Sequence, residues 1–171
     1  ETLPQIDPAG WAHEIGIAWD CDTGNARELH RGGGRDYSGV GAREMPMTLD
    51  VLGLTADGEA AVVCDFKTGF KRVASARHNY QLRAGAGAAA RLHGRSRVFT
   101  AVIYVREDGS PWFDRAEMDQ LDLDDAADDL RALAARVVTA RGDVAAGRQP
   151  ALHTGDWCKH CPARLSCPAV T

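Results

Sequence analysis

The chain has 171 residues, of which 44% are hydrophobic and 26% are charged. This length suits one domain, or one domain with a small appendage, and it is sufficient to bury a single core. No run approaches the ~20 continuous apolar residues that a membrane-spanning helix requires. The ordinary apolar fraction and the formal net charge of -4 exclude a fibrous or fully disordered protein. That charge, taken alone, argues against a strongly basic nucleic-acid-binding protein.

Acidic and basic side chains are sorted along the chain, although their totals nearly balance. Residues 66–106 carry nine basic residues and no Asp or Glu, whereas residues 107–129 carry ten acidic residues and one base, Arg115. Two such blocks can turn one surface toward a polyanion and the other toward solvent. Two ordinary solvated faces explain the same pattern.

The N-terminal segment predicts strands joined by turns. Residues 12–19 and 26–30, separated by the turn Asp22-Thr23-Gly24, predict a β-hairpin. Residues 31–41 contain five glycines and predict a loop. The chain begins with Glu1 rather than Met and shows no signal peptide at its start, so we expect a piece of a longer or processed protein, located in the cytoplasm.

Two apolar segments follow the loop. Residues 45–54 are extended in character, and residues 60–66 form an almost wholly apolar run of strand length after the turn Ala56-Asp57-Gly58. Such a run is typical of a central strand that is buried on both faces. Asp65 stands at the end of this run, where a carboxylate without a function would carry a desolvation cost.

The second half predicts two helices around a further strand. Residues 79–93 are rich in alanine and end at Gly94, which suits the C-terminal cap of a helix. Gly85 and Gly87 each weaken a helix by about 1 kcal/mol relative to Ala, but small residues let a helix lie close on a sheet.

Residues 98–105 predict the next strand, and residues 124–146 carry apolar side chains at helical spacing with acids in the first turn. This order of elements predicts an α/β domain with a central mixed sheet flanked by helices.

Asp50, Asp65 and Lys67 form the most informative constellation. Two acids on adjacent strands joined by a tight turn can converge, and a Lys two residues after the second acid lies on the same face of the strand. Carboxylates are the oxygen ligands that Mg²⁺ prefers, and a lysine can orient water or offset charge on a phosphate. A structural ion pair between Asp65 and Lys67 is the alternative.

The string Asp65-Phe66-Lys67-Thr68-Gly69, with Asp50 upstream and a helix opening at Gln81-Leu82 downstream, resembles the PD-(D/E)XK nuclease superfamily. The likeness is to the RecB-like branch, which includes CRISPR-associated RecB-like exonucleases and the nuclease domains of recombination helicase-nucleases. It implies a restriction-endonuclease-like core.

The resemblance assigns Asp50 and Asp65 as ligands of Mg²⁺ or Mn²⁺, Lys67 as the catalytic lysine, and Gln81 as the glutamine that opens the DNA-side helix. The usual Gln-x-x-x-Tyr is incomplete, because Gly85 stands where Tyr is expected. The usual metal-binding His would lie before residue 1. Glu14 is our candidate for an additional metal ligand, ahead of His13, although an exposed strand position without function explains both.

Cys158, Cys161 and Cys167 have the spacing C-x₂-C-x₅-C near the C-terminus. Three thiolates this close suit a soft metal, and no secretory signal favours disulfides instead. The resemblance implies a structural [4Fe-4S] cluster whose fourth cysteine normally lies before residue 1; Cys21 is a further candidate, and Cys64 suits a core position better. Zinc bound by these cysteines with His153 or His160 is the alternative.

The resemblance therefore implies a nuclease domain at residues 1–150, incomplete at its N-terminus, and a Cys-rich tail at 151–171 packed on the same domain. The expected function is a metal-dependent DNA nuclease of exonuclease type, acting in DNA repair, recombination, phage or CRISPR processes. Expected partners are single-stranded DNA or duplex ends and a helicase or CRISPR/recombination protein, without a membrane. An inactive nuclease-fold module that binds DNA or a partner remains the alternative.

Overall fold

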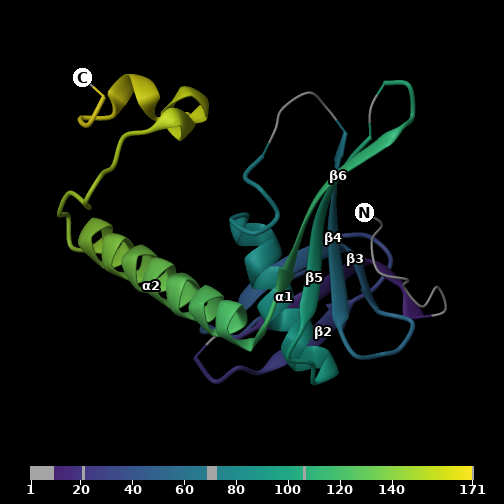
Figure 1. Ribbon diagram of the computed structural model, residues 1–171. Helices are drawn as coiled ribbons and strands as arrows, with labels where there is room; N and C mark the ends of the chain where they lie inside the picture. Colours follow the sequence, from purple (N-terminus) through teal and green to yellow (C-terminus); the bar gives the residue numbers. More distant parts are fainter. Residues whose placement is uncertain (1–9, 21, 69–72, 106, 171) are drawn as a thin grey trace. The chain divides into compact units, whose positions relative to one another are not determined.

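A computed structural model describes residues 10–20, 22–68, 73–105 and 107–170 of the chain (Figure 1). The chain divides into two compact units, Glu1–Arg131 and Ala132–Thr171. A search of the described residues finds no helix with the length and apolar character needed to cross a membrane.

The first unit is built on a six-stranded sheet with the order β2-β1-β3-β4-β5-β6 (Figure 1). Its strands are β1 (Ala12–Trp19), β2 (Ala26–His30), β3 (Met45–Leu54), β4 (Ala61–Thr68), β5 (Val98–Val105) and β6 (Pro111–Met118). Strands β4 and β5 are parallel and are connected through the helix α1 (Tyr80–His93), whereas the other described neighbours are antiparallel. The predicted mixed sheet of an α/β domain is confirmed.

Helix α1 has well-defined caps at both ends. The Asn79 side chain accepts hydrogen bonds from the backbone N–H groups of Gln81 and Leu82, at 2.9 and 3.4 Å. Gly94 follows the last turn with φ 62, in the left-handed conformation that favours glycine at this position. These caps explain why the helix begins and ends within one residue of the predicted bounds.

The sheet buries apolar side chains on both faces, but the described helices contribute to one face. Alternate residues of β4 divide accordingly: Ala61 and Val63 belong to the larger cluster, and Val62 and Cys64 to the smaller one. The larger cluster includes residues of α1 and of the first turns of α2 (Gln120–Ala145). The smaller cluster consists of strand residues.

Strand β6 and the start of α2 depart from the sequence prediction. The pattern at residues 111–118 does not predict a strand, because Asp114 and Glu117 interrupt its apolar side chains; pairing with β5 supplies the missing stabilisation. Helix α2 begins at Gln120 rather than at residue 124. Asp119 and Asp122 form reciprocal hydrogen bonds between backbone N–H and side chain at 3.0 and 3.4 Å, which fixes this N-terminus.

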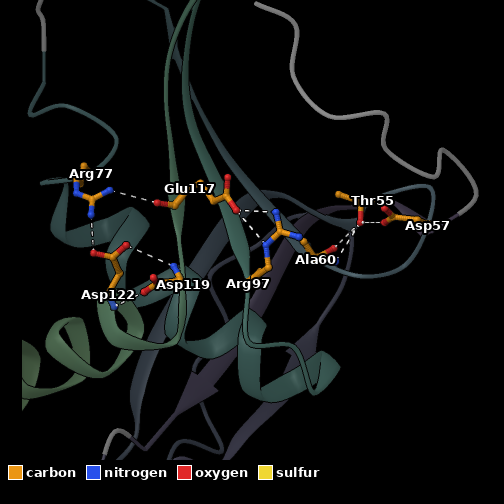
Figure 2. A network of polar contacts seen from close by, with 8 residues as sticks. All are labelled: Thr55, Asp57, Ala60, Arg77, Arg97, Glu117, Asp119 and Asp122. Carbon is orange, nitrogen blue, oxygen red and sulfur yellow. Dashed lines mark hydrogen bonds and ion pairs between the residues drawn. The ribbon is translucent and has the colours of Figure 1, made fainter.

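The acidic and basic blocks of the sequence meet in the folded first unit. Arg77 pairs with Asp122, Arg83 with Asp129, and Arg97 with Glu117, each at 2.6 Å. Figure 2 shows two of these pairs, with Arg77 also donating to the backbone oxygen of Glu117. The acidic residues on β6 and α2 therefore partly neutralise the basic residues, although the two kinds of charge lie in separate blocks of the sequence.

Candidate metal centre and active site

Asp50 and Asp65 stand at the point where strands β3 and β4 stop pairing. The last antiparallel pair at this end is Val51 with Cys64, and the next residue on each strand is one of the two acids. Asp65 is buried, with 3% of its surface exposed, whereas Asp50 is half-buried. Asp50 Oδ2 accepts a hydrogen bond from the Phe66 backbone N–H at 2.7 Å, which ties the first acid to the strand that carries the second.

Lys67 lies on the same face of β4 as Asp65. Its Nζ atom is 2.6 Å from Asp65 Oδ2, and the two side chains are 30% and 4% exposed. The Asp65 Oδ2 atom is buried. It forms this ion pair with Lys67 but accepts no hydrogen bond from the described residues. A buried carboxylate oxygen in this state can still coordinate a cation.

Glu14 occupies a corresponding position on the other neighbour of β3. In the pairing of β1 with β3, His13 is opposite Val51 and Ile15 is opposite Leu49, so Glu14 and Asp50 lie between these two pairs, although they are not paired with each other. Glu14 has φ 48, the sole positive φ of a non-glycine residue in the described ranges. This conformation costs on the order of 1 kcal/mol, and such residues are concentrated at functional sites. The three candidate acids therefore lie at one level of three adjacent strands.

His13 is exposed, as Glu14 is, and packs its ring against Trp11 at 5.9 Å between centroids. Its partner in the sheet is Val51, which belongs to the smaller apolar cluster. Nothing in these contacts links His13 to either Asp50 or Asp65.

Gln81 is exposed in the first turn of α1, where it follows the capping residue Asn79. One turn later, Gly85 faces the sheet. A Cβ atom at position 85 would lie 2.8 Å from Leu49 Cδ2 and 3.2 Å from Val63 Cγ1. The expected small-residue contact between α1 and the sheet is confirmed, and it leaves no room for a Tyr side chain at this position.

Cys64 behaves as a core residue. It is 3% exposed and lies with Val51, Val62 and Ala101 in the smaller apolar cluster. Burial, followed by the charge of Asp50, raises the pKa of its thiol to about 11. A protonated thiol in an apolar cluster is a poor metal ligand, since the thiolate is the ligating form.

The Cys-rich tail belongs to the second unit and forms short 3-10 turns at Asp156–His160 and Arg164–Ser166. Cys158 and Cys167 are half-buried, and Cys161 is exposed. The Gly155 backbone N–H donates to Cys158 Sγ at 3.4 Å. Cys21, a candidate fourth ligand, lies outside the described residues, as does Gly69 of the motif string.

A search of the described residues finds no group of three or more His, Cys, Asp or Glu side chains arranged to hold a metal ion. This result applies to the tail and to the sheet. Two carboxylates are nevertheless a sufficient protein contribution for Mg²⁺, which retains water molecules and takes further oxygens from a phosphate. Asp50 and Asp65 fit that requirement.

The sequence matches the family model of the PD-(D/E)XK nuclease superfamily over residues 48–168. The chain belongs to this superfamily. The matched range contains Asp50, Asp65, Lys67 and the three tail cysteines. Members of the PD-(D/E)XK superfamily are generally nucleases, act on DNA, and typically use Mg²⁺ or Mn²⁺.

No match was found among curated protein sequences. Among solved structures, the chain is similar to the crystal structure of SSO0001, with a TM-score of 0.42 and 16% sequence identity. The similarity covers 94% of this chain and 61% of that one, so the chain spans about three fifths of the length of SSO0001.

Proposed function

We propose that this chain is a Mg²⁺- or Mn²⁺-dependent deoxyribonuclease of the RecB-like branch, acting as an exonuclease on single strands or duplex ends. The observation that carries this proposal is the meeting of Asp50, Asp65 and Lys67 where β3 and β4 part. Membership of the PD-(D/E)XK superfamily supports hydrolysis of a phosphodiester as the reaction.

In this proposal, Asp50 and Asp65 hold the divalent ion, with Glu14 as a further ligand. When bound, the ion would polarise a phosphoryl oxygen and lower the pKa of water. The hydrogen bond from Phe66 to Asp50 supports a metal role for that acid, because it fixes one carboxylate oxygen and orients the other.

Lys67 is the proposed catalytic lysine. Its ion pair with Asp65 supports this role, because the pair holds the ammonium group beside the place where a phosphate would bind the ion. A cation there offsets the negative charge that develops on the phosphate and can orient the attacking water. Gln81, exposed at the start of α1, is the proposed contact to the DNA strand.

Cleavage of labelled oligonucleotides tests the proposal. Wild-type protein, Lys67→Ala and Asp65→Asn are compared on a single strand and on a blunt duplex, with Mg²⁺, Mn²⁺, Ca²⁺ or EDTA. Glu59→Gln is the matched control, because Glu59 is an exposed carboxylate before the opposite end of β4. Loss of one group that stabilises the transition state typically costs about 10²–10³ in kcat.

Undiminished cleavage by Lys67→Ala would overturn the assignment of the lysine. Binding of DNA by wild-type protein without any Mn²⁺-dependent product would instead favour the second candidate, a nuclease-fold module that binds without cutting. The observation in favour of that candidate is Gly85, which replaces the usual Tyr and is enclosed by Leu49 and Val63.

For the tail at 151–171, the proposal is a structural [4Fe-4S] cluster held by Cys158, Cys161 and Cys167, with zinc as the alternative. The spacing of the thiols and their partial exposure support metal binding. Anaerobically purified protein should then be brown, with a broad absorption band near ~400 nm. A colourless protein that contains stoichiometric zinc would favour the alternative.

The division into a nuclease domain at 1–150 and this tail, the cytoplasmic location, and a helicase or CRISPR/recombination partner remain parts of the proposal. So does a role in DNA repair, recombination, phage or CRISPR processes. Superfamily membership supports DNA as the substrate and does not distinguish among these processes.

A further inference from the structure

An aromatic pair lies on the same row of the sheet as Lys67. Parallel pairing of β4 and β5 places Lys67 beside Tyr104, and antiparallel pairing of β5 and β6 places Tyr104 beside Trp112. The two rings are in contact, with centroids 4.9 Å apart and planes at 39°. Neighbouring residues of one row project from the same face of a sheet.

The composition of the core confirms which face this is. Asp65, two residues before Lys67, is paired with Val102, and Ala61 with Val98; both valines belong to the larger apolar cluster, as does Tyr104. The carboxylate of Asp65, the ammonium of Lys67 and the two rings therefore share the face of the sheet on which α1 packs.

The two aromatic residues differ in exposure. Tyr104 is 9% exposed, and its hydroxyl oxygen accepts a hydrogen bond from the Val73 backbone N–H at 3.1 Å. Trp112 is 38% exposed. The contact with a fixed inner ring holds the outer ring in place, and the outer ring is partly exposed.

Strand spacing sets the distance between the backbones of Trp112 and Lys67. Two strand intervals separate Lys67 from Trp112, roughly 9–10 Å at the usual spacing within a sheet. That distance corresponds to about three nucleotides at the 3.4 Å spacing of stacked DNA, and to fewer in an extended strand. A nucleotide close to a phosphate at Lys67 can thus reach the indole.

We propose that Trp112, supported by Tyr104, is a stacking platform for an unpaired nucleobase within about three nucleotides of the cleaved phosphate, and that it makes the site prefer single-stranded ends to intact duplex. A base inside a duplex has both faces covered by its neighbours, whereas a base in a single strand can stack on an aromatic side chain. The inference rests on the proposed nuclease function.

Binding measured apart from cleavage tests the platform. Oligonucleotides with 2-aminopurine at successive positions from one end are titrated with protein in Ca²⁺, and Mn²⁺ is used separately for cleavage. Stacking on the indole should quench the probe at one or two adjacent positions. Trp112→Ala should abolish this quenching and weaken single-strand binding by about 5- to 150-fold, the range expected for one stacked base.

Two further variants make the result specific. Trp112→Phe keeps an aromatic face and should recover most of the quenching and affinity, which also shows that loss in Trp112→Ala is not a folding defect. Trp11→Ala is the matched control, because Trp11 has the same exposure of 38% but precedes β1. Trp11→Ala should bind and quench as wild type does.

Unchanged single-strand affinity and quenching in Trp112→Ala, with wild-type cleavage retained, would overturn the platform and leave the nuclease proposal intact. Equal losses in Trp112→Ala and Trp11→Ala would also overturn it, because they would report nonspecific aromatic binding. Wild-type protein that quenches the probe without cutting in Mn²⁺ would support the platform and refute the catalytic proposal.

Discussion

Gly85→Ala is the substitution that most directly tests how the helix supports the candidate metal centre. The new Cβ would lie 2.8 Å from Leu49 Cδ2 and 3.2 Å from Val63 Cγ1. Both side chains are buried, at 2% and 0% exposure, so neither can move into solvent. Leu49 directly precedes Asp50, and Val63 is two residues before Asp65 on the same face of β4. Strain at position 85 therefore reaches both acids.

Two opposing effects determine the change in stability. Replacing Gly by Ala inside a helix contributes about 1 kcal/mol of stabilisation. Overpacking a close-packed core costs about 1–3 kcal/mol. The expected net result is a loss of about 0–2 kcal/mol, and a shift of the two carboxylates should also lower Mn²⁺ affinity by about tenfold, the lower end of the effect of disturbing ligand support.

Two other helical glycines provide matched controls. At Gly87, a Cβ would lie 2.6 Å from Cη2 of the buried Trp19, on β1 and away from both acids, so Gly87→Ala should destabilise the fold without weakening Mn²⁺ binding. At Gly142 in α2, no atom lies within 4 Å of the new Cβ, so Gly142→Ala should stabilise by up to about 1 kcal/mol.

Urea unfolding followed by near-UV circular dichroism gives the stabilities, and calorimetric titration gives the Mn²⁺ affinities. If Gly85→Ala raises the free energy of unfolding as much as Gly142→Ala does, the close contact between α1 and the sheet is refuted. An equal loss of Mn²⁺ affinity in Gly85→Ala and Gly87→Ala would show that the loss reflects general destabilisation rather than displacement of Asp50 and Asp65.

Two further predictions concern titrating groups outside the centre. Because the pKa of the Cys64 thiol is raised to about 11, roughly one thiol in a thousand is ionised at pH 8. Iodoacetamide should therefore label Cys64 only after unfolding, which peptide mass spectrometry can show. Rapid labelling of the folded protein would contradict the burial of Cys64. Burial, followed by the charges of Arg95 and Arg31, lowers the pKa of His93 below its unfolded value of about 6.5. The unfolded chain then binds more protons than the folded chain near and below that pH, so the stability of the protein should fall as the pH decreases. Between pH 7.5 and pH 5, the urea midpoint of His93→Gln should fall less than that of the wild type. An equal fall in both proteins would contradict the lowered pKa of His93.

The sequence patterns predict the strands and the helix that surround the candidate centre, because the apolar pattern or the caps that form each element lie within its own stretch of sequence. The run at 60–66 is apolar except for Asp65, and the structure contains a strand at Ala61–Thr68 that is buried on both faces over 61–65, whereas Phe66 is 44% exposed. Asn79 and Gly94 provide both caps of α1 within its own sequence. Spacing along β4 likewise brings Asp65 and Lys67 together, and their contact at 2.6 Å fulfils that geometry.

The features that sequence patterns miss depend on pairing between distant segments. Strand β6 has little apolar periodicity of its own and exists because β5 offers it a partner. That Glu14 lies level with Asp50 depends on the register of β1 with β3, which the spacing within either strand does not predict. Trp112 carries no signal at all until the register of three strands places it on the row of Lys67.

The ion pairs between the two charged blocks bear on the proposed binding of DNA by this chain. Arg97 and Glu117 are about half exposed, and pairs of this kind contribute at most about 1 kcal/mol, so a phosphate can displace the carboxylate. Arg83 is 15% exposed and is a less available contact. A phosphate that replaces Glu117 or Asp122 leaves a carboxylate nearby, and this repulsion offsets part of the attraction. Sequence-independent phosphate contacts by the basic block should therefore be weaker than its nine bases suggest. In the proposed function, the metal ion and base stacking then supply a larger share of the binding.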